Sequence, residues 1–308
     1  METKKMYDAI IVGGSVAGLS AALVLGRSMR KVMVIDSGQP CNRNTPHSHS
    51  FMTRDGATPA ELTSIARQQA LAYPTVSVRN DKVLSITKIN DVFSAKTEQG
   101  SHLKARKILL ATGVYDIMPD IEGFADCWGI SVLHCPYCHG YEVKNQSLGV
   151  FIAGDHLEMY ASLIQHWSKD VTLFTNGNIL TSVQRDKLRS LHIPIVEVPI
   201  VRLDHNEGML RALEMQDGTR YGVTALFAPT PTRLPGDLAQ QLGCQLKEAG
   251  LIEVNPSGQT SVSGVFAAGD NSSPMRQLSM ASAAGNAAGA RLNFELVEDD
   301  LMELGNYN

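Results

Sequence analysis

The chain has 308 residues, of which 44% are hydrophobic and 19% are charged, proportions ordinary for a soluble protein large enough for two cores. Its net charge of −4 excludes the basic footprint of a protein that binds nucleic acid or an anionic membrane. The start of the chain lacks the apolar run of a signal peptide, and no apolar stretch is long enough to span a bilayer, so we expect a cytoplasmic protein.

A strand, a glycine-rich turn and a helix are predicted at the start of the chain. Residues 8–12 predict a buried parallel strand, the glycine-rich segment 13–18 follows, and residues 19–27 predict a helix. The next strand ends in Asp36. This order is typical of a dinucleotide site, where helix N–H groups face a pyrophosphate and the acid accepts from a ribose hydroxyl. Ser15 replaces the usual second glycine, so a pyrophosphate must accommodate one small side chain; a purely structural turn is the alternative.

The next segments complete a first domain. A polar loop at 39–56 carries His47 and His49, and we expect both histidines to be structural rather than catalytic. A helix is predicted at 59–72, a β-meander at 76–105 and a buried strand at 107–113, with Pro119 and Gly123 marking a hinge.

A Cys-x-x-Cys sequence lies near the middle of the chain. Cys135 and Cys138 can close a small disulfide and store two electrons, and His134 and His139 flank them as candidate proton carriers. A haem attachment site, half of a zinc site and a pair of inert thiols are the alternatives. Redox chemistry is favoured because a reducing compartment disfavours static disulfides and covalent haem is normally attached after export. A zinc site would need further ligands at matching spacing, and the other cysteines stand alone: Cys41, Cys127 and Cys244.

A second strand-turn-helix unit follows the cysteines. Strands are predicted at 148–152 and 171–174, with a helix at 158–167 between them. The intervening turn has lost two of the usual glycines and carries Asp155, whose carboxylate would repel a pyrophosphate. No arginines follow the second strand at 175–177 to hold a 2′-phosphate, so this unit predicts a Rossmann frame without its ligand chemistry.

The rest of the chain completes the second unit and then returns to a buried strand. That strand is predicted at 259–270 and ends in Gly269-Asp270, before a helix at 278–292 that is rich in small residues. Small residues permit close approach to a flat ligand, although tight core packing alone is the alternative. The remaining predicted elements are a helix at 183–191 and strands at 195–201, 210–215 and 225–228.

Across nearly its whole length the chain resembles the low-molecular-weight thioredoxin reductases. Four signatures match in order: the 13–18 fingerprint with its acid, the 111–113 turn, the Cys-x-x-Cys, and the 260–270 segment followed by Arg276-Gln277. The resemblance implies an α/β fold with two Rossmann-like, three-layer ββα domains. It divides the chain into a first part of an FAD-binding domain at 1–117, an inserted nucleotide-domain-like module with the redox cysteines at 118–244, and the rest of the FAD-binding domain at 245–308.

The resemblance also assigns roles to residues. It places Asp270 at the FAD ribityl chain and Cys138 nearest the flavin, which leaves Cys135 to meet the substrate, and His139 takes the place of an acid that handles protons. The residues expected to hold FAD are Gly13, Gly14, Ser15, Ala17, Gly18, Asp36, Ala111, Thr112, Gly113, Gly269, Asp270, Arg276, Gln277 and Leu278.

The Cys-Pro-Tyr-Cys-His-Gly version of the motif is similar to a subgroup that includes dithiol oxidases of gliotoxin- and holomycin-type pathways. Those enzymes bind FAD, do not need NADPH and pass electrons from a dithiol to oxygen, so NADP is a doubtful cofactor here. The resemblance implies a homodimeric flavoprotein acting on a small dithiol or disulfide, or on a thioredoxin-like protein. The alternatives are an NADPH- or ferredoxin-dependent thioredoxin-disulfide reductase and, from another class, a non-catalytic flavin redox sensor.

Overall fold

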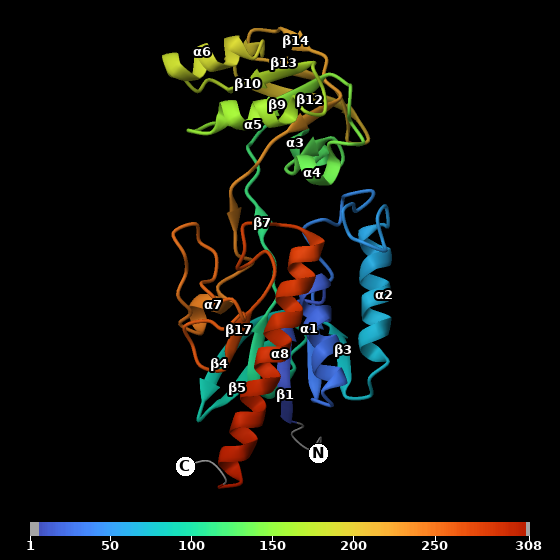
Figure 1. Ribbon diagram of the computed structural model, residues 1–308, viewed down its shortest axis with the longest axis vertical. Helices are drawn as coiled ribbons and strands as arrows, with labels where there is room; N and C mark the ends of the chain where they lie inside the picture. The colour runs from blue at the N-terminus through green and yellow to red at the C-terminus, as the bar shows by residue number, and fades with distance from the viewer. Residues whose placement is uncertain (1–5, 306–308) are drawn as a thin grey trace. The chain divides into compact units, whose positions relative to one another are not determined.

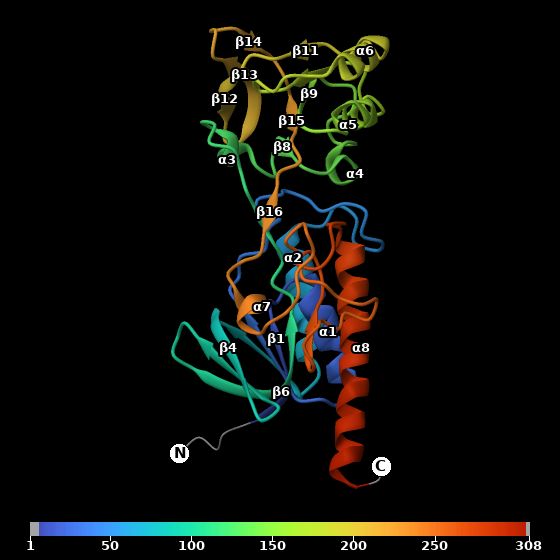
Figure 2. The ribbon, with the colours of Figure 1, turned by 90° about the vertical axis from the view of Figure 1, so that its left-hand side faces the viewer.

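The computed structural model describes residues 6–305, which form two compact units of chain (Figure 1, Figure 2). Among these residues, the first unit comprises 6–43, 51–115 and 232–305, and the second comprises 44–50 and 116–231. The expectation that the chain begins without a signal peptide rests partly on residues 1–5, which lie outside the described residues.

The first unit is built on a mixed sheet. Within the described residues the sheet has seven strands in the order β3-β2-β1-β6-β5-β4, with β17 also pairing with β6. Strands β1, β2, β3, β6 and β17 run parallel, whereas β4 and β5 are antiparallel. The elements of this unit are β1 (Met6–Val12), α1 (Val16–Arg27), β2 (Val32–Asp36), α2 (Pro59–Leu71), β3 (Val76–Asn80), β4 (Val83–Ile89), β5 (Val92–Thr97), β6 (His102–Leu110), α7 (Leu238–Gln241), β17 (Val265–Ala267) and α8 (Leu278–Glu303).

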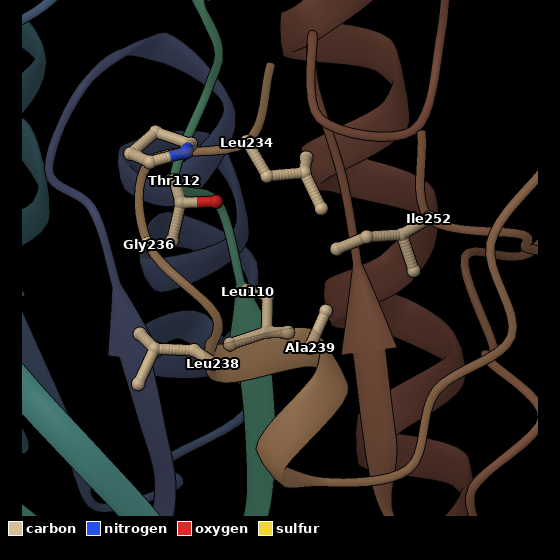
Figure 3. Close-up of a pocket in the computed structure, with 8 residues that line it drawn as sticks. Leu110, Thr112, Leu234, Gly236, Leu238, Ala239 and Ile252 are labelled. Atoms are coloured by element: carbon tan, nitrogen blue, oxygen red, sulfur yellow. The ribbon is translucent and has the colours of Figure 1, made fainter. Parts of the chain in front are cut away.

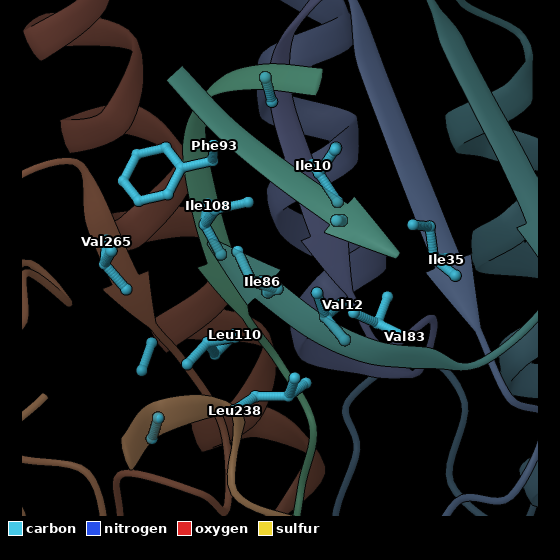
Figure 4. Packing of buried hydrophobic residues seen from close by; sticks show 14 of the residues in the cluster. Ile10, Val12, Ile35, Val83, Ile86, Phe93, Ile108, Leu110, Leu238 and Val265 are labelled. Atoms are coloured by element: carbon cyan, nitrogen blue, oxygen red, sulfur yellow. The ribbon is translucent and has the colours of Figure 1, made fainter. Parts of the chain in front are cut away.

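Alternation along β1 divides the core of this unit between two faces of the sheet. Ile10 and Val12 point to the face covered by the β4–β5 hairpin and α7, where Phe93 is fully buried (Figure 4). Ile11 points to the other face, which α1 and α8 cover. Period-two alternation with both faces buried therefore produces the expected three layers.

Helix α8 packs on α1 through small residues and extends further than predicted. A Cβ added to Gly285 would lie 2.0 Å from the Ala17 carbonyl oxygen, so the two helices approach backbone to backbone. The predicted end at residue 292 was wrong, because the helix continues to Glu303. Leu296 is fully buried in this extension, and the Asp299 carboxylate lies 2.9 Å from the Lys107 amine on β6.

The second unit contains a parallel sheet and an antiparallel sheet. Its parallel sheet has the order β11-β10-β9-β15-β8, and the antiparallel sheet has the order β12-β13-β14. The elements of this unit are α3 (Phe124–Cys127), β8 (Val132–Leu133), α4 (Pro136–His139), β9 (Leu148–Phe151), α5 (Leu157–Ile164), β10 (Val171–Phe174), α6 (Ser182–Ser190), β11 (Ile195–Val196), β12 (Ile200–Asn206), β13 (Met209–Met215), β14 (Arg220–Tyr221) and β15 (Ala225–Phe227).

The parallel sheet of the second unit lies between two hydrophobic clusters. Leu148 and Val150 pack with the buried residues of α5 and α6, whereas Phe174 packs with those of β12 and β13. The single strand predicted at 195–201 is two strands in the structure. The Asn176 side chain accepts a hydrogen bond from the Ile200 backbone N–H at 2.8 Å, which helps the chain leave the parallel sheet and start the antiparallel one.

The chain leaves the first unit at β7 (Tyr115–Asp116) and returns at β16 (Thr232–Arg233), and these two short strands pair. The return comes earlier than the expected boundary at 244/245. Leu238, Ala239 and Cys244 are buried in the core of the first unit, which explains why residues 232–244 belong to it.

Candidate functional site

The two cysteines of the Cys-x-x-Cys sequence form a disulfide at the start of a short helix. Cys135 is the N-cap of α4, its Cα lies 5.3 Å from that of Cys138, and Pro136 occupies the first helical turn. The Cys138 backbone N–H donates to the Cys135 sulfur at 3.2 Å. This contact will favour negative charge on the Cys135 sulfur whenever the disulfide opens.

His139 follows the second cysteine and is half-buried. Burial lowers the pKa of His139 below 6.5, and a nearby charge on His49 acts in the same direction, while Glu142 opposes both. At neutral pH His139 is therefore a neutral imidazole that can accept a proton.

The loop histidines do not behave alike. His47 is exposed, whereas the His49 Nε2 lies 3.5 Å from a carboxylate oxygen of Glu142. His49 and Glu142 both belong to the second unit, close enough to His139 to affect its pKa. Sequence reasoning missed Glu142, although its position just beyond the cysteines was a signal that could have identified it.

His134 is held by packing on the other side of the cysteines. Its ring stacks on Trp128 with the ring centroids 6.1 Å apart, and its backbone carbonyl accepts a hydrogen bond from the Tyr160 hydroxyl at 3.1 Å. These contacts fit a positioning role better than proton transfer.

Two tyrosines beside the disulfide are exposed. Tyr137 and Tyr141 have 60% and 68% of their surface accessible, and Tyr137 meets Trp167 edge to face at 5.8 Å. A Cβ added to Gly140 would lie 2.8 Å from the Trp167 ring, so this glycine lets the cysteine segment pack on the tryptophan. An apolar surface is thus available next to Cys135.

In the first unit, the residues expected to hold a dinucleotide gather at one edge of the sheet. Strands β1, β2, β6 and β17 are parallel, and Val12 pairs with Ile35 and Leu110, which pairs with Ala267. Their carboxyl ends therefore lie together. The residues at or just beyond these ends are Gly13, Gly14, Ser15, Asp36, Ala111, Thr112, Gly113, Gly269 and Asp270.

The glycine turn fits closely between its neighbours. A Cβ on Gly13 would lie 2.2 Å from the Ala111 carbonyl oxygen, and one on Gly18 would lie 2.0 Å from the Gly13 carbonyl oxygen. A Cβ on Gly14 would lie 2.7 Å from the Asp36 side chain, which places that acid directly against the turn. Ser15 is the N-cap of α1 but its side chain makes no capping hydrogen bond to the helix, so α1 presents its N-terminal amides at this edge.

The other expected residues lie at the start of α8. The Asp270 carboxylate lies 3.7 Å from the Arg276 Nε and also accepts from the Cys41 thiol at 3.7 Å. Gln277 is the N-cap of α8, and Leu278 is its first residue. Ala17 of α1 lies between α8 and Gly269, so it supports the turn that contains Gly269.

Residues 7–288 match the family described as pyridine nucleotide-disulphide oxidoreductase. The chain belongs to this family. It is 33% identical to thioredoxin reductase sirT from Leptosphaeria maculans, with 96% of each chain covered, and 33% identical to thioredoxin reductase tcpT from Claviceps purpurea, with 97% of each covered. The crystal structure of HlmI has 34% identity and a TM-score of 0.93, covering 99% of this chain and 96% of that one.

These comparisons confirm the resemblance and the two-domain Rossmann-like fold that the motifs predicted. This family member is an FAD-dependent disulfide oxidoreductase of the thioredoxin reductase type.

The edge of the first unit's sheet fits FAD in two further respects. The turn contains glycines at which a side chain would collide with neighbouring parts of the chain, as the tight turn and close helix–strand packing of a dinucleotide fingerprint require. Asn271 is fully buried and donates to the Leu110 carbonyl at 2.9 Å, yet its Oδ1 finds no hydrogen-bond partner among the described residues. A buried oxygen of this kind suits a ligand donor, and sequence reasoning missed Asn271 because nothing in the pattern distinguished it from its neighbours.

A small pocket of the first unit lies near this edge but is too small for a cofactor (Figure 3). Its volume is about 10 Å³, which is roughly the space of one water molecule. Thr112, Leu234 and Ile252 are among the residues that line it.

The second βαβ turn of the family fold has surroundings that differ from those of the glycine turn in the first unit. Its residues 153–156 are exposed, and Gly154 adopts a φ of +102°. Glu158 in the first turn of α5 accepts a hydrogen bond from Lys187 at 2.7 Å, which lowers its pKa. The Arg185 guanidinium donates to both carboxylate oxygens of Glu197, at 3.0 and 2.6 Å.

No three His, Cys, Asp or Glu side chains between residues 6 and 305 come together as metal ligands would. None of the helices described is both long enough and apolar enough to cross a bilayer.

Proposed function

We propose that this FAD-dependent disulfide oxidoreductase is a dithiol oxidase that works without NADPH. The supporting observation is the second nucleotide turn, where a charged carboxylate stands in place of a phosphate-binding surface. In a βαβ unit the pyrophosphate would lie at the N-terminus of α5, and Glu158 occupies the first turn of that helix.

The basic residues near this turn support the same proposal. Lys187 is paired with Glu158, and Arg185 makes a bidentate pair with Glu197. A nucleotide 2′-phosphate would have to displace one of these carboxylates, and it would then face Asp155 in the exposed turn. NADPH binding here is therefore electrostatically unfavourable.

The expected substrate is a small dithiol. Exposed Tyr137 and Tyr141 offer apolar contacts beside Cys135, which suit a compact apolar molecule. A thioredoxin-like protein is the other substrate that this surface can accept, and the two are distinguished by steady-state turnover with each.

The reaction begins with attack of a substrate thiolate on the Cys135 sulfur, which breaks the Cys135–Cys138 bond and releases Cys138 as a thiolate. The second substrate thiol then attacks the mixed disulfide and releases Cys135, whose sulfur receives the Cys138 N–H. The product is a substrate disulfide, and its two electrons now reside on the cysteine pair. We assign to His139 the role of the base that accepts the proton of an attacking thiol and passes it on before the next thiol attacks. FAD, when bound, supplies the acceptor for the two electrons of this dithiol.

The residues proposed to hold FAD are those at the sheet edge of the first unit. The Gly13–Gly18 turn would face the pyrophosphate, Asp36 a ribose, and Asp270 the ribityl chain.

Anaerobic flavin spectroscopy tests the proposal. We expect dithiothreitol to bleach the flavin absorbance of the purified protein, while NADPH and NADH leave it unchanged on the same timescale. Rapid bleaching by NADPH would identify an NADPH-dependent reductase, and reduction by ferredoxin alone would identify a ferredoxin-linked one. A single stoichiometric reduction by dithiol, without aerobic turnover, would identify a redox sensor.

A further inference from the structure

The proposed oxidation of a dithiol releases two protons at the same place, one after the other. Each substrate thiol must lose its proton before it attacks a sulfur, and a neutral histidine ring has a single nitrogen free to accept one. His139 must therefore pass on the first proton before the second thiol reacts. Because its side chain is half-buried, a group that lies near it and also meets water would carry the proton out.

Glu142 lies close to His139 and is accessible to water. It follows His139 by three residues, in the turn that continues from α4, and residues three apart on a helical turn share one side of it. Burial lowers the pKa of His139, and the charge on Glu142 opposes that shift, as expected of a carboxylate near an imidazole. The Glu142 side chain is 42% exposed, so its carboxylate can exchange protons with solvent.

His49 reaches the same carboxylate from a loop that is distant in sequence. Its Nε2 lies 3.5 Å from the Glu142 Oε1, while its own side chain is only 23% exposed. The loop at 44–50 that carries His49 belongs to the second unit, where Thr45 packs on Gly129: a Cβ added to Gly129 would lie 3.3 Å from the Thr45 Oγ1. His49 is therefore held in place by its loop and in turn limits where the Glu142 carboxylate can go.

We propose that Glu142 takes the proton from His139 and releases it to water, and that His49 is a positioning residue which keeps the Glu142 carboxylate within reach. This route rests on the proposed dithiol oxidation, whose protons it carries out of the site. For each substrate disulfide made, two S–H bonds break and one S–S bond forms, and the two electrons stay on the cysteine pair. The two protons pass in turn to the His139 imidazole, to the Glu142 carboxylate and then to water.

Flavin bleaching in a single turnover tests the route. The FAD-loaded protein is mixed with dithiothreitol without oxygen, at one pH and at low or high concentrations of imidazole. At low imidazole we expect E142Q to bleach at least about tenfold more slowly than the wild type, because the first proton stays on His139. High imidazole should restore most of this rate, since free imidazole can take the proton directly. The wild type should bleach at a rate that does not depend on imidazole.

Matched variants separate proton transfer from structural support. E207Q removes an exposed carboxylate from the β12–β13 turn of the same unit and should bleach like the wild type. H49Q should be slowed less than E142Q and also recover with imidazole, whereas H47Q, at an exposed histidine of the same loop, should not be slowed.

Several results would contradict the route. An E142Q variant as fast as the wild type would show that His139 loses its proton directly to water. A slow E142Q that imidazole does not restore would show that Glu142 only supports the structure of the site. A wild type whose rate rises with imidazole would show that free buffer, rather than Glu142, normally accepts the proton. H49Q at the wild-type rate would remove His49 from the route.

The route and the dithiol oxidase can fail separately. If NADPH bleaches the wild type and dithiothreitol does not, the oxidase proposal is wrong, but the cysteines still exchange with a disulfide. The same variants are then compared in the reduction of oxidised glutathione by the NADPH-reduced protein, where the protons travel inward. Slow turnover of E142Q that imidazole restores is again the expected result, and the absence of either effect contradicts the route.

Discussion

The backbone N–H of Cys138 donates a hydrogen bond to the sulfur of Cys135, with a nitrogen–sulfur distance of 3.2 Å. The first cysteine therefore caps the short helix that carries the second. An N–H directed at a sulfur stabilises its thiolate, and a stabilised thiolate leaves a mixed disulfide faster. This geometry suits Cys135 to form the bond with substrate and then to release it.

Substitution of the second cysteine tests the assigned roles. C138S removes the sulfur that must leave when substrate attacks Cys135, so we expect aerobic turnover of a small dithiol to fall below detection. The purified variant should stay yellow, because the residues proposed to hold FAD belong to the first unit. C244S, which alters a buried cysteine of that first unit, should retain turnover. Persistent turnover in C138S would show that Cys138 is not the leaving sulfur.

His139 should govern the acid limb of the pH–rate profile. Burial lowers the pKa of His139 below 6.5, so its neutral form persists as the pH falls somewhat below that value. H139Q should reduce kcat/KM by about 10²- to 10⁴-fold and remove this limb, whereas the exposed H156Q should do neither.

Glu142 provides a finer test of the same site. Its charge raises the pKa of His139 against the larger effect of burial, so E142Q should move the acid limb to lower pH. An acid limb that moves to higher pH in E142Q, or that survives in H139Q, would exclude His139 as the base.

The local motifs could be predicted from sequence because each depends on residues that are close together in the chain. The glycine turn before α1 depends on close backbone approach that only glycine allows, and Pro136 restricts the backbone between the two cysteines. The end of α8 and the return of the chain at Thr232 could not be predicted in this way. The first depends on Lys107, far away in sequence, and the second on burial of Leu238 against the sheet.

The candidate site, too, has features that depend on residues distant in sequence and could not be predicted. The sequence could not show that His49 meets Glu142 near the redox cysteines, because this contact depends on the packing of the loop at 44–50 with the second unit. The lack of a hydrogen-bond partner for the Asn271 Oδ1 among the described residues could be recognised only from its burial and its neighbours in the structure. Both features depend on contacts between segments that are distant in sequence, and such contacts cannot be predicted from a periodic pattern of residues.

Flavin binding should require the close backbone contact between Gly13 and Gly18 in the glycine turn. A methyl group at residue 18 would lie 2.0 Å from the Gly13 carbonyl oxygen, a backbone atom that cannot move without opening the turn. We expect G18A to lose most of its flavin absorbance per mole of protein. In the control G222A the added carbon would meet only the Arg211 carbonyl oxygen, 3.9 Å away. Full flavin content in G18A would argue against the proposed pyrophosphate position.

Lys107 should form a main stabilising contact between the sheet of the first unit and the end of α8. Its buried amine lies 3.3 Å from a Glu295 oxygen and 2.9 Å from an Asp299 oxygen. K107M removes the cation nearest to both carboxylates and leaves them to Arg106, 3.8 Å from Asp299, and Arg291, 3.9 Å from Glu295, which we expect to lower the free energy of unfolding by about 2 kcal/mol. K104M removes an exposed lysine from the same strand and should cost much less. Urea unfolding followed by circular dichroism compares the two, and equal midpoints would show that the arginines and solvent, rather than Lys107, neutralise the acids of α8.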